Sequence, residues 1–305
     1  MKAGSNLEKI LSSGGFAVTA EIGPPKGADG EHMKEWGRKL RGKADAFNVT
    51  DNQTAVVRLS SLAGSVLLLQ EGVEPVMQMV CRDRNRIAMQ SDALGASALG
   101  IKNLLCLTGD HQSLGSQPMA KNVFDVDSIQ ELLMFKTMRD EKKVWGADAL
   151  TVAPALFLGA AENPFANPFE FRVRRLAKKV LAGADFIQTQ VIYDIDRFER
   201  FMEDVRSHHL EDNVHIMGGV TPLKSAKVAK YMKTKVAGIM MPDSVISRME
   251  KAPDPKAEGI KICIETVNQL RTIKGVHGVH VMAIAWEEKV PEIVEGAGLL
   301  PRPVP

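Results

Sequence analysis

Short apolar segments of this chain repeatedly end on a polar residue, after which the sequence turns. Three of these segments end at Glu21, Thr50 and Gln190, and a fourth, residues 104–107, runs into a Thr-Gly-Asp turn. A barrel of alternating strands and helices builds an active site in this way, because the C-terminal ends of its parallel strands all meet at one face. The pattern therefore predicts an enzyme whose chemistry lies at that face.

Eight segments have the length and apolar content of buried strands. They are residues 16–21, 46–50, 75–80, 103–107, 149–153, 186–190, 214–217 and 279–283. A glycine that can end a helix precedes several of them, which favours parallel strands joined by helices. We expect class α/β and a single (β/α)8 TIM barrel over residues 1–305, with a short N-terminal helix after Ser5 and an extended C-terminal tail. The first strand is not followed by the G-x-G-x-x-G fingerprint of a dinucleotide-binding open sheet.

Composition excludes several other classes of protein. The net charge of +2 is too small to indicate a nucleic-acid or membrane partner. The three cysteines show no Cys-x-x-Cys spacing, so we expect no metal site and no iron–sulfur cluster within this chain. The start lacks a signal-peptide pattern and no apolar run is long enough to span a membrane, which predicts a cytoplasmic protein. A basic cluster at residues 172–179 is either a solvated helix face or a phosphate-binding patch.

The strand ends place several polar side chains on the predicted upper face. They are Glu21, Thr50, Gln78, Asp110 and Gln190. Two carboxyl groups facing one cavity can take different roles if their surroundings separate their pKa values. The apolar strand before Glu21 favours a desolvated proton donor, and the open loop around Asp110 favours an ionised group. The alternative for each acid alone is a helix cap or a salt bridge. His277 and His280, which flank a late strand, are interpreted as structural.

Four of these segments resemble, in order, those of the methylenetetrahydrofolate reductase family. Residues 18–25, Val-Thr-Ala-Glu-Ile-Gly-Pro-Pro, resemble its first strand, and residues 47–50 resemble its second. Residues 105–110 resemble its Arg-Gly-Asp loop with Thr108 in place of the arginine, and residues 183–190 resemble its sixth strand. The ordered set carries the resemblance, since no single motif is specific.

The resemblance implies a flavin-dependent barrel enzyme that reduces methylenetetrahydrofolate to methyltetrahydrofolate. Glu21 would be the general acid, and Glu21, Asp110 and Gln190 would contact the folate. The implied flavin contacts are Thr50, Gln78, Thr108, Gly109, Asp110, His111, Ala161, Asn163 and Lys179. Gln78 stands where the family has a histidine, and Trp286 where it has an arginine that helps to hold the folate tail.

The same resemblance implies FAD as the cofactor, with FMN as the alternative, and NAD(P)H as a possible electron donor. A partner subunit carrying iron–sulfur centres is a second possible donor, and we expect a homo- or hetero-oligomer. Two other functions stay open. One is a barrel subunit that is active only with such an iron–sulfur partner, and the other is a pterin methyltransferase that contains no flavin.

Overall fold

Eight parallel strands close into a barrel in the order in which they occur along the chain. The computed structural model describes residues 1–146, 148–236 and 238–304. The strands are β1 (Ala17–Ile22), β2 (Ala46–Val49), β3 (Pro75–Val80), β4 (Asn103–Leu107), β5 (Phe157–Glu162), β6 (Phe186–Val191), β7 (His215–Val220) and β8 (Val276–Val281). β8 pairs with β1 and completes the ring. The predicted fold, a single-domain (β/α)8 barrel, is confirmed.

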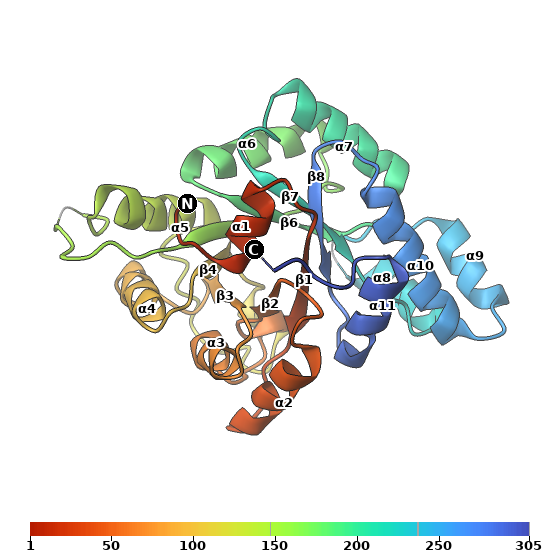
Figure 1. Ribbon diagram of the computed structural model, residues 1–305, viewed down its shortest axis with the longest axis horizontal. Helices are drawn as coiled ribbons and strands as arrows, with labels where there is room; N and C mark the ends of the chain where they lie inside the picture. Colours follow the sequence, from red (N-terminus) through yellow and green to blue (C-terminus); the bar gives the residue numbers. More distant parts are fainter. Residues whose placement is uncertain (147, 237, 305) are drawn as a thin grey trace.

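Helices surround the barrel on its outside (Figure 1). The α-helices are α1 (Asn6–Ser12), α2 (Gly30–Leu40), α3 (Ser61–Gln70), α4 (Arg86–Ala98), α5 (Ser128–Lys136), α6 (Arg172–Ala182), α7 (Ile195–Ser207), α8 (Ala226–Lys235), α9 (Asp243–Lys251), α10 (Pro255–Leu270) and α11 (Val290–Gly296). Shorter helical turns are η1 (Gln53–Ala55), η2 (Gln112–Leu114), η3 (Thr137–Glu141), η4 (Phe169–Phe171) and η5 (Glu287–Lys289). No helix in the described part of the chain is both long enough and apolar enough to cross a membrane.

The N-terminal helix α1 closes the lower end of the barrel. Ser5 caps it by accepting a hydrogen bond from the backbone N–H of Glu8, as Ser and Thr commonly do at this position. Leu7, Ile10 and Leu11 are buried against the lowest layer of side chains inside the barrel. In Figure 1 this helix and the C-terminal end of the chain lie over the centre of the ring. The lower end is therefore sealed by apolar packing, which leaves the upper end for chemistry.

The barrel interior changes from apolar to polar along its axis. The lowest layer contains residues such as Phe157, Phe186 and Met217. Side chains two residues apart on a strand share one face, so the next layer up is set by the residue two positions further along each strand. That layer contains polar side chains from five strands, all buried: Thr19, Asn48, Gln78, Gln188 and His280. The polar layer forms the floor of the upper end.

The predicted fifth strand, residues 149–153, is wrong. Ala149 instead forms an isolated antiparallel bridge with Lys143 in an excursion that projects from the barrel (left in Figure 1). The true strand, β5, contains Gly159 and two alanines, residues with weak strand propensity. A Cβ atom at Gly159 would lie 2.2 Å from the Phe186 ring. Position 159 therefore accommodates only glycine, because an aromatic ring from β6 fills the space that a side chain would need.

Candidate active site

A cavity of about 420 Å³ opens at the upper end of the barrel. Ligand pockets in proteins typically measure about 300–1,000 Å³, so the cavity is large enough for a small molecule or part of a cofactor. Its walls come from the C-terminal ends of β1, β4, β5, β6 and β8 and from one side of α6. This is the face that the strand-end pattern predicts.

Seven of the predicted site residues line this cavity: Glu21, Gln78, Thr108, Ala161, Asn163, Lys179 and Gln190. Four are not among its described lining residues: Thr50, Gly109, Asp110 and His111. Thr50 is buried and its hydroxyl has no hydrogen-bond partner within the described structure. The roles assigned to all eleven residues stay predictions, but Glu21 and Gln190 do face a common space.

Glu21 combines burial with access to the cavity. Its side chain is 20% exposed and lines the cavity wall. Burial, with a smaller contribution from the negative charge of Glu287, raises the pKa of the Glu21 carboxyl group to about 7. A carboxyl group in this range is partly protonated at neutral pH and can donate its proton. The prediction that the strand before Glu21 desolvates it agrees with this environment.

His280, from β8, is the nearest titratable neighbour of Glu21. Its Nε2 atom lies 3.9 Å from Glu21 Oε2. Burial lowers the pKa of His280 to about 3, so the ring is neutral throughout the range in which Glu21 titrates. His280 also lines the cavity wall, and the structural role that the sequence suggested for it stays a prediction.

Gln190 lies at the end of β6 on the cavity wall. Its Oε1 atom accepts a hydrogen bond from the backbone N–H of Val191 at 2.9 Å. This bond fixes the carbonyl end of the side-chain amide and leaves the Nε2 hydrogens to donate to a ligand.

One side of the cavity is cationic and comes from α6. Arg172, Arg175 and Lys179 line it, while Arg174 and Lys178 on the same helix are exposed. Lys179 Nζ lies 2.6 Å from Glu162 Oε2, and burial lowers the Lys179 pKa. The basic cluster thus has a cavity-facing side and a solvated side, and phosphate binding by it stays a prediction.

Asp110 belongs to the loop after β4 and is not among the described residues that line the cavity. Its exposed carboxylate accepts a hydrogen bond from the backbone N–H of Thr54 at 3.1 Å. Its backbone carbonyl accepts a hydrogen bond from Arg82 at 3.0 Å. The loop therefore pairs with the turn after β2, whereas Thr108, two residues earlier, reaches the cavity.

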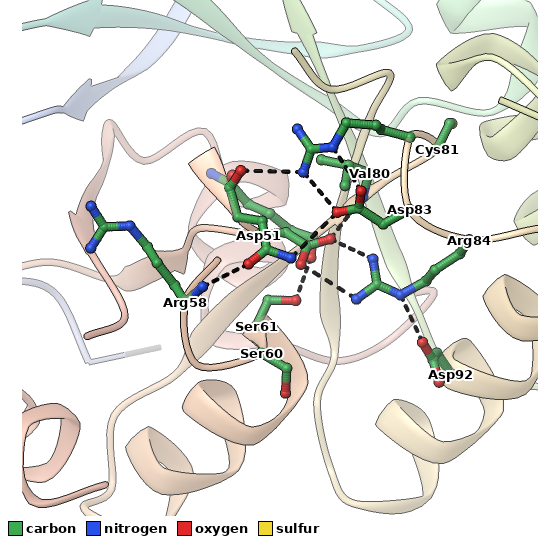
Figure 2. Close-up of polar contacts among 12 residues, drawn as sticks. Asp51, Arg58, Ser60, Ser61, Val80, Cys81, Asp83, Arg84 and Asp92 are labelled. Carbon is green, nitrogen blue, oxygen red and sulfur yellow. Dashed lines mark hydrogen bonds and ion pairs between the residues drawn. The ribbon is translucent and has the colours of Figure 1, made fainter. Parts of the chain in front are cut away.

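A cluster of charged side chains fixes the loops after β2 and β3 to one another (Figure 2). Arg84 lies between two carboxylates, with 2.6 Å to Asp51 Oδ2 and 3.0 Å to Asp92 Oδ2. The Asp51 side chain is fully buried and also accepts a hydrogen bond from the backbone N–H of Val80. Arg82 adds a link to the backbone carbonyl of Asn52. These bonds brace the loops on the β2–β4 side of the barrel mouth.

Several cavity residues escaped the sequence prediction: Ser128, Glu162, Arg172, Arg175, Gln188, His280 and Met282. One of them carried a usable signal, since Gln188 lies two positions from Gln190 on β6 and so shares a strand face with it. The arginines lie on a helix whose orientation the sequence alone does not fix. Within the described residues, no group of three or more His, Cys, Asp or Glu side chains is arranged to hold a metal ion.

Comparison with known proteins gives a consistent family match. The model of the family "Methylenetetrahydrofolate reductase" matches residues 6–298. Methylenetetrahydrofolate reductase 2 of Schizosaccharomyces pombe is 25% identical, over 98% of this chain and 48% of its own length. Methylenetetrahydrofolate reductase (NADH) 1 of Arabidopsis thaliana is also 25% identical, over 98% of this chain and 51% of its own length. The chain thus spans about half the length of these curated relatives.

Solved structures share the fold. A protein of Clostridium thermocellum, described as binding two copies of 5-methyl-5,6,7,8-tetrahydrofolic acid, superposes with a TM-score of 0.66 at 14% identity. The match covers 97% of this chain and 99% of that one. A 2,3-dimethylmalate lyase gives a TM-score of 0.51 at 11% identity, over 92% of this chain and 81% of its own.

Proposed function

Since this chain belongs to the methylenetetrahydrofolate reductase family, as its motifs predicted, we propose that it reduces methylenetetrahydrofolate to methyltetrahydrofolate, with Glu21 as general acid. The observation that carries the proposal is a largely buried carboxyl group, with a pKa of about 7, on the wall of the cavity that also contains Gln190. The fold shared with the C. thermocellum protein described as binding 5-methyltetrahydrofolic acid supports a folate ligand.

Glu21 supplies the proton that the reaction needs. The substrate carries a methylene carbon bridging two nitrogens in a five-membered ring. Protonation of one nitrogen by Glu21 weakens its bond to that carbon, and the ring opens to an electrophilic iminium. A neutral carboxyl group at pH 7 is suited to this step, because a general acid works best with a pKa near the operating pH.

Gln190 orients the folate in the same cavity. Its amide donates through Nε2 while Oε1 is held by the backbone N–H of Val191, so it suits the acceptor edge of a pterin or an amide. Asp110 is proposed to contact the pterin from the loop after β4, where its carboxylate is exposed. Bringing it to the cavity would require its hydrogen bond to Thr54 to break.

The residues present fit a flavin. Arg172 and Arg175 provide positive charge on one side of the cavity, and Arg172 Nε is buried without a hydrogen-bond partner within the described structure. Such groups suit the phosphates of FAD, our first choice, or of FMN. Gln78 and Thr108 line the cavity and offer donors and acceptors for a polar ring edge. A bound flavin would supply the hydride, while the protein binds and orients both ligands.

The electron donor is proposed to be NADH or NADPH. The Arabidopsis relative carries NADH in its name, and a Caenorhabditis elegans relative, 24% identical over 81% of this chain, carries NADPH. An iron–sulfur partner subunit is the alternative. Comparing folate reduction with NADH, with NADPH and with a chemical reductant separates the two, since a partner-dependent chain responds only to the chemical reductant.

A first experiment tests the function as a whole. The purified protein is denatured to release its cofactor for identification by mass, and a second sample is reduced and mixed with methylenetetrahydrofolate under anaerobic conditions. We expect FAD or FMN in the first sample and methyltetrahydrofolate in the second. A colourless protein without flavin would instead favour the pterin methyltransferase, and a flavoprotein that forms no methyltetrahydrofolate would contradict the proposed reaction.

Substitution of the cationic side tests the proposed cofactor position. We expect Arg175→Ala to weaken flavin binding by roughly 10-fold or more, because a charge-assisted hydrogen bond contributes about 1.5–3 kcal/mol. Flavin retained on a desalting column, measured by absorbance, reports the effect. The exposed neighbour Arg174 provides the matched control Arg174→Ala, and equal retention by both variants would contradict a phosphate site at Arg175.

The pH dependence follows from the raised pKa of Glu21. Only the protonated form can donate, so the rate of folate reduction should be level below pH 7 and fall as pH rises through about 7. The expected slope above the midpoint is about tenfold per pH unit. A single-turnover rate measured from pH 5.5 to 9 checks this, and a rate that rises with pH in this range would contradict the assignment.

A further inference from the structure

A chain of hydrogen bonds crosses the polar layer of the barrel and ends at His280, whose Nε2 atom lies 3.9 Å from Glu21 Oε2. Asn48 and Gln188 pair through their amides, with 2.6 Å from Asn48 Nδ2 to Gln188 Oε1 and 3.0 Å in the reverse direction. Gln188 Nε2 also donates to Thr19 Oγ1 at 3.0 Å. Thr19 Oγ1 lies 3.0 Å from His280 Nδ1, and His280 Nε2 faces Glu21.

The donors and acceptors in this chain favour one position for the proton of His280. The Gln188 amide pairs with the amide of Asn48 and presents its N–H to Thr19. Because Thr19 accepts that bond, its own hydroxyl hydrogen is available to donate to His280 Nδ1. A neutral imidazole that accepts at Nδ1 carries its proton on Nε2. In that tautomer the N–H of His280 points toward the Glu21 carboxyl group.

We propose that Asn48, Gln188 and Thr19 are positioning residues that fix His280 as the Nε2–H tautomer, so that its N–H dipole is directed at Glu21. We call the hydrogen-bonded set Asn48, Gln188, Thr19 and His280 the relay. The proposal rests on the proposed function, since the relay acts through the general acid, Glu21. Glu21 becomes negatively charged when it gives up its proton, and a fixed N–H dipole stabilises that charge without a proton leaving the ring.

Burial and position support a role beyond packing. Thr19 and Asn48 are fully buried, and Gln188 and His280 are each 3% exposed. Polar groups placed in a barrel interior are costly unless every partner is present. The layer directly below uses apolar side chains at the equivalent positions of the same strands, such as Ala17, Ala46 and Phe186. The polar layer begins where the interior approaches the cavity.

Two titratable side chains face Glu21 and bear on its protonation. His280 comes from β8, and Glu287 comes from η5, where its charge acts on Glu21 from a distance. With the opposite tautomer, the lone pair of His280 Nε2 would face Glu21 and disfavour the carboxylate. Loss of the relay should therefore make Glu21 a weaker acid. The effect of the Glu287 charge on Glu21 does not depend on the His280 tautomer.

Thr19→Val tests the relay, because valine keeps the shape of threonine and removes the hydroxyl group. Thr19→Ser is the matched control, since it keeps the hydroxyl. The first readout is the tautomer of His280 in the protein without substrate, read from the ¹⁵N chemical shifts of its ring at pH 7.5, with His280→Gln used to assign the signal. We expect the Nε2–H pattern in wild type and in Thr19→Ser, and a shift toward the Nδ1–H pattern in Thr19→Val.

The second readout is the pH profile of single-turnover folate reduction. In Thr19→Val the midpoint should move upward by about one unit, equal to a tenfold change in the acid dissociation constant of Glu21, while Thr19→Ser stays near the wild-type midpoint. His280→Gln, whose amide nitrogen can take the place of Nε2, should restore a midpoint closer to wild type than His280→Phe does.

The outcomes separate the relay from the function. The Nδ1–H tautomer in wild type, or equal midpoints in Thr19→Val and Thr19→Ser, would overturn the relay even if the protein reduces folate. The expected tautomers in a protein that forms no methyltetrahydrofolate would leave the relay geometry in place and reject the proposed function, and with it the role of the relay in that reaction. A folded Thr19→Val protein is verified by its circular dichroism before either readout.

Discussion

Glu21→Gln is expected to lower the rate of folate reduction by roughly 10²–10⁴-fold, the contribution typical of a general acid. Glutamine keeps the size and polarity of the side chain but has no proton of comparable acidity to donate. Reduction of the bound flavin by a chemical donor requires no proton from Glu21 and should stay near the wild-type rate. The two half-reactions, followed separately by stopped-flow absorbance, measure the effect. Loss of both rates together at normal flavin content would reject the acid role.

Glu287→Gln is the matched control for this change. It removes a carboxylate whose charge acts on Glu21, and it is not among the described residues that line the cavity. Because the negative charge of Glu287 raises the Glu21 pKa, its removal should lower the midpoint of the pH profile while leaving folate reduction measurable. A loss of activity as large as that of Glu21→Gln would indicate that folate reduction depends on the negative charge around Glu21 and not on the proton that Glu21 donates.

In Glu21→Gln the free energy of unfolding should rise, although the rate of folate reduction falls. The folded-state pKa of Glu21, about 7, lies above the ordinary value for glutamate. The native state therefore holds more protons than the unfolded state between the ordinary pKa and pH 7, and the free energy of unfolding falls as pH rises through this window. Glu21→Gln removes this penalty, so its urea midpoint should exceed that of wild type by more at pH 8 than at pH 5.

Arg84→Leu is expected to lower the free energy of unfolding by about 3–5 kcal/mol. The substitution leaves the fully buried Asp51 carboxylate with its bond to the Val80 N–H but without its charged partner (Figure 2). Removing one member of a buried ion pair is costly because the remaining charge is not solvated. Urea unfolding followed by circular dichroism measures the change.

An exposed pair provides the contrast. Lys230 and Glu250 form a salt bridge of 2.5 Å with side chains that are 58% and 45% exposed. The free energy of unfolding of Lys230→Gln should stay within about 1 kcal/mol of the wild-type value, because exposed ion pairs contribute little.

The double variant Asp51→Asn/Arg84→Leu should recover part of the stability lost in Arg84→Leu. Equal stabilities for Arg84→Leu and Lys230→Gln would show that the loops after β2 and β3 do not depend on this cluster.

The sequence predicted the parts of the site that depend on strand alternation. β3 and β4 have the predicted bounds, and Glu21 and Gln190 were identifiable because each closes an apolar run with a polar side chain. β5 was misplaced because its central residues are small, and at Gly159 the small size follows from the Phe186 ring of the next strand. A contact between segments of this kind leaves no local signal in the sequence.

Residues positioned by helix and loop geometry were harder to predict. Arg172 and Arg175 reach the cavity only through the way α6 packs against the barrel. Asp110 matches the family motif, yet its loop directs the carboxylate to the backbone of Thr54. His280 was taken as structural because a lone histidine on a strand carries no sign of its partners, and those partners come from three other strands.

A structure of the flavin-loaded protein with bound 5-methyltetrahydrofolate tests the central claim most directly. We predict that the flavin ring and the pterin lie together in the cavity between β1 and β6, with the Glu21 carboxyl group directed at the folate and the Gln190 amide bonded to it. A pterin bound outside this cavity, or a flavin ring that leaves no room for folate beside Glu21, would contradict the account.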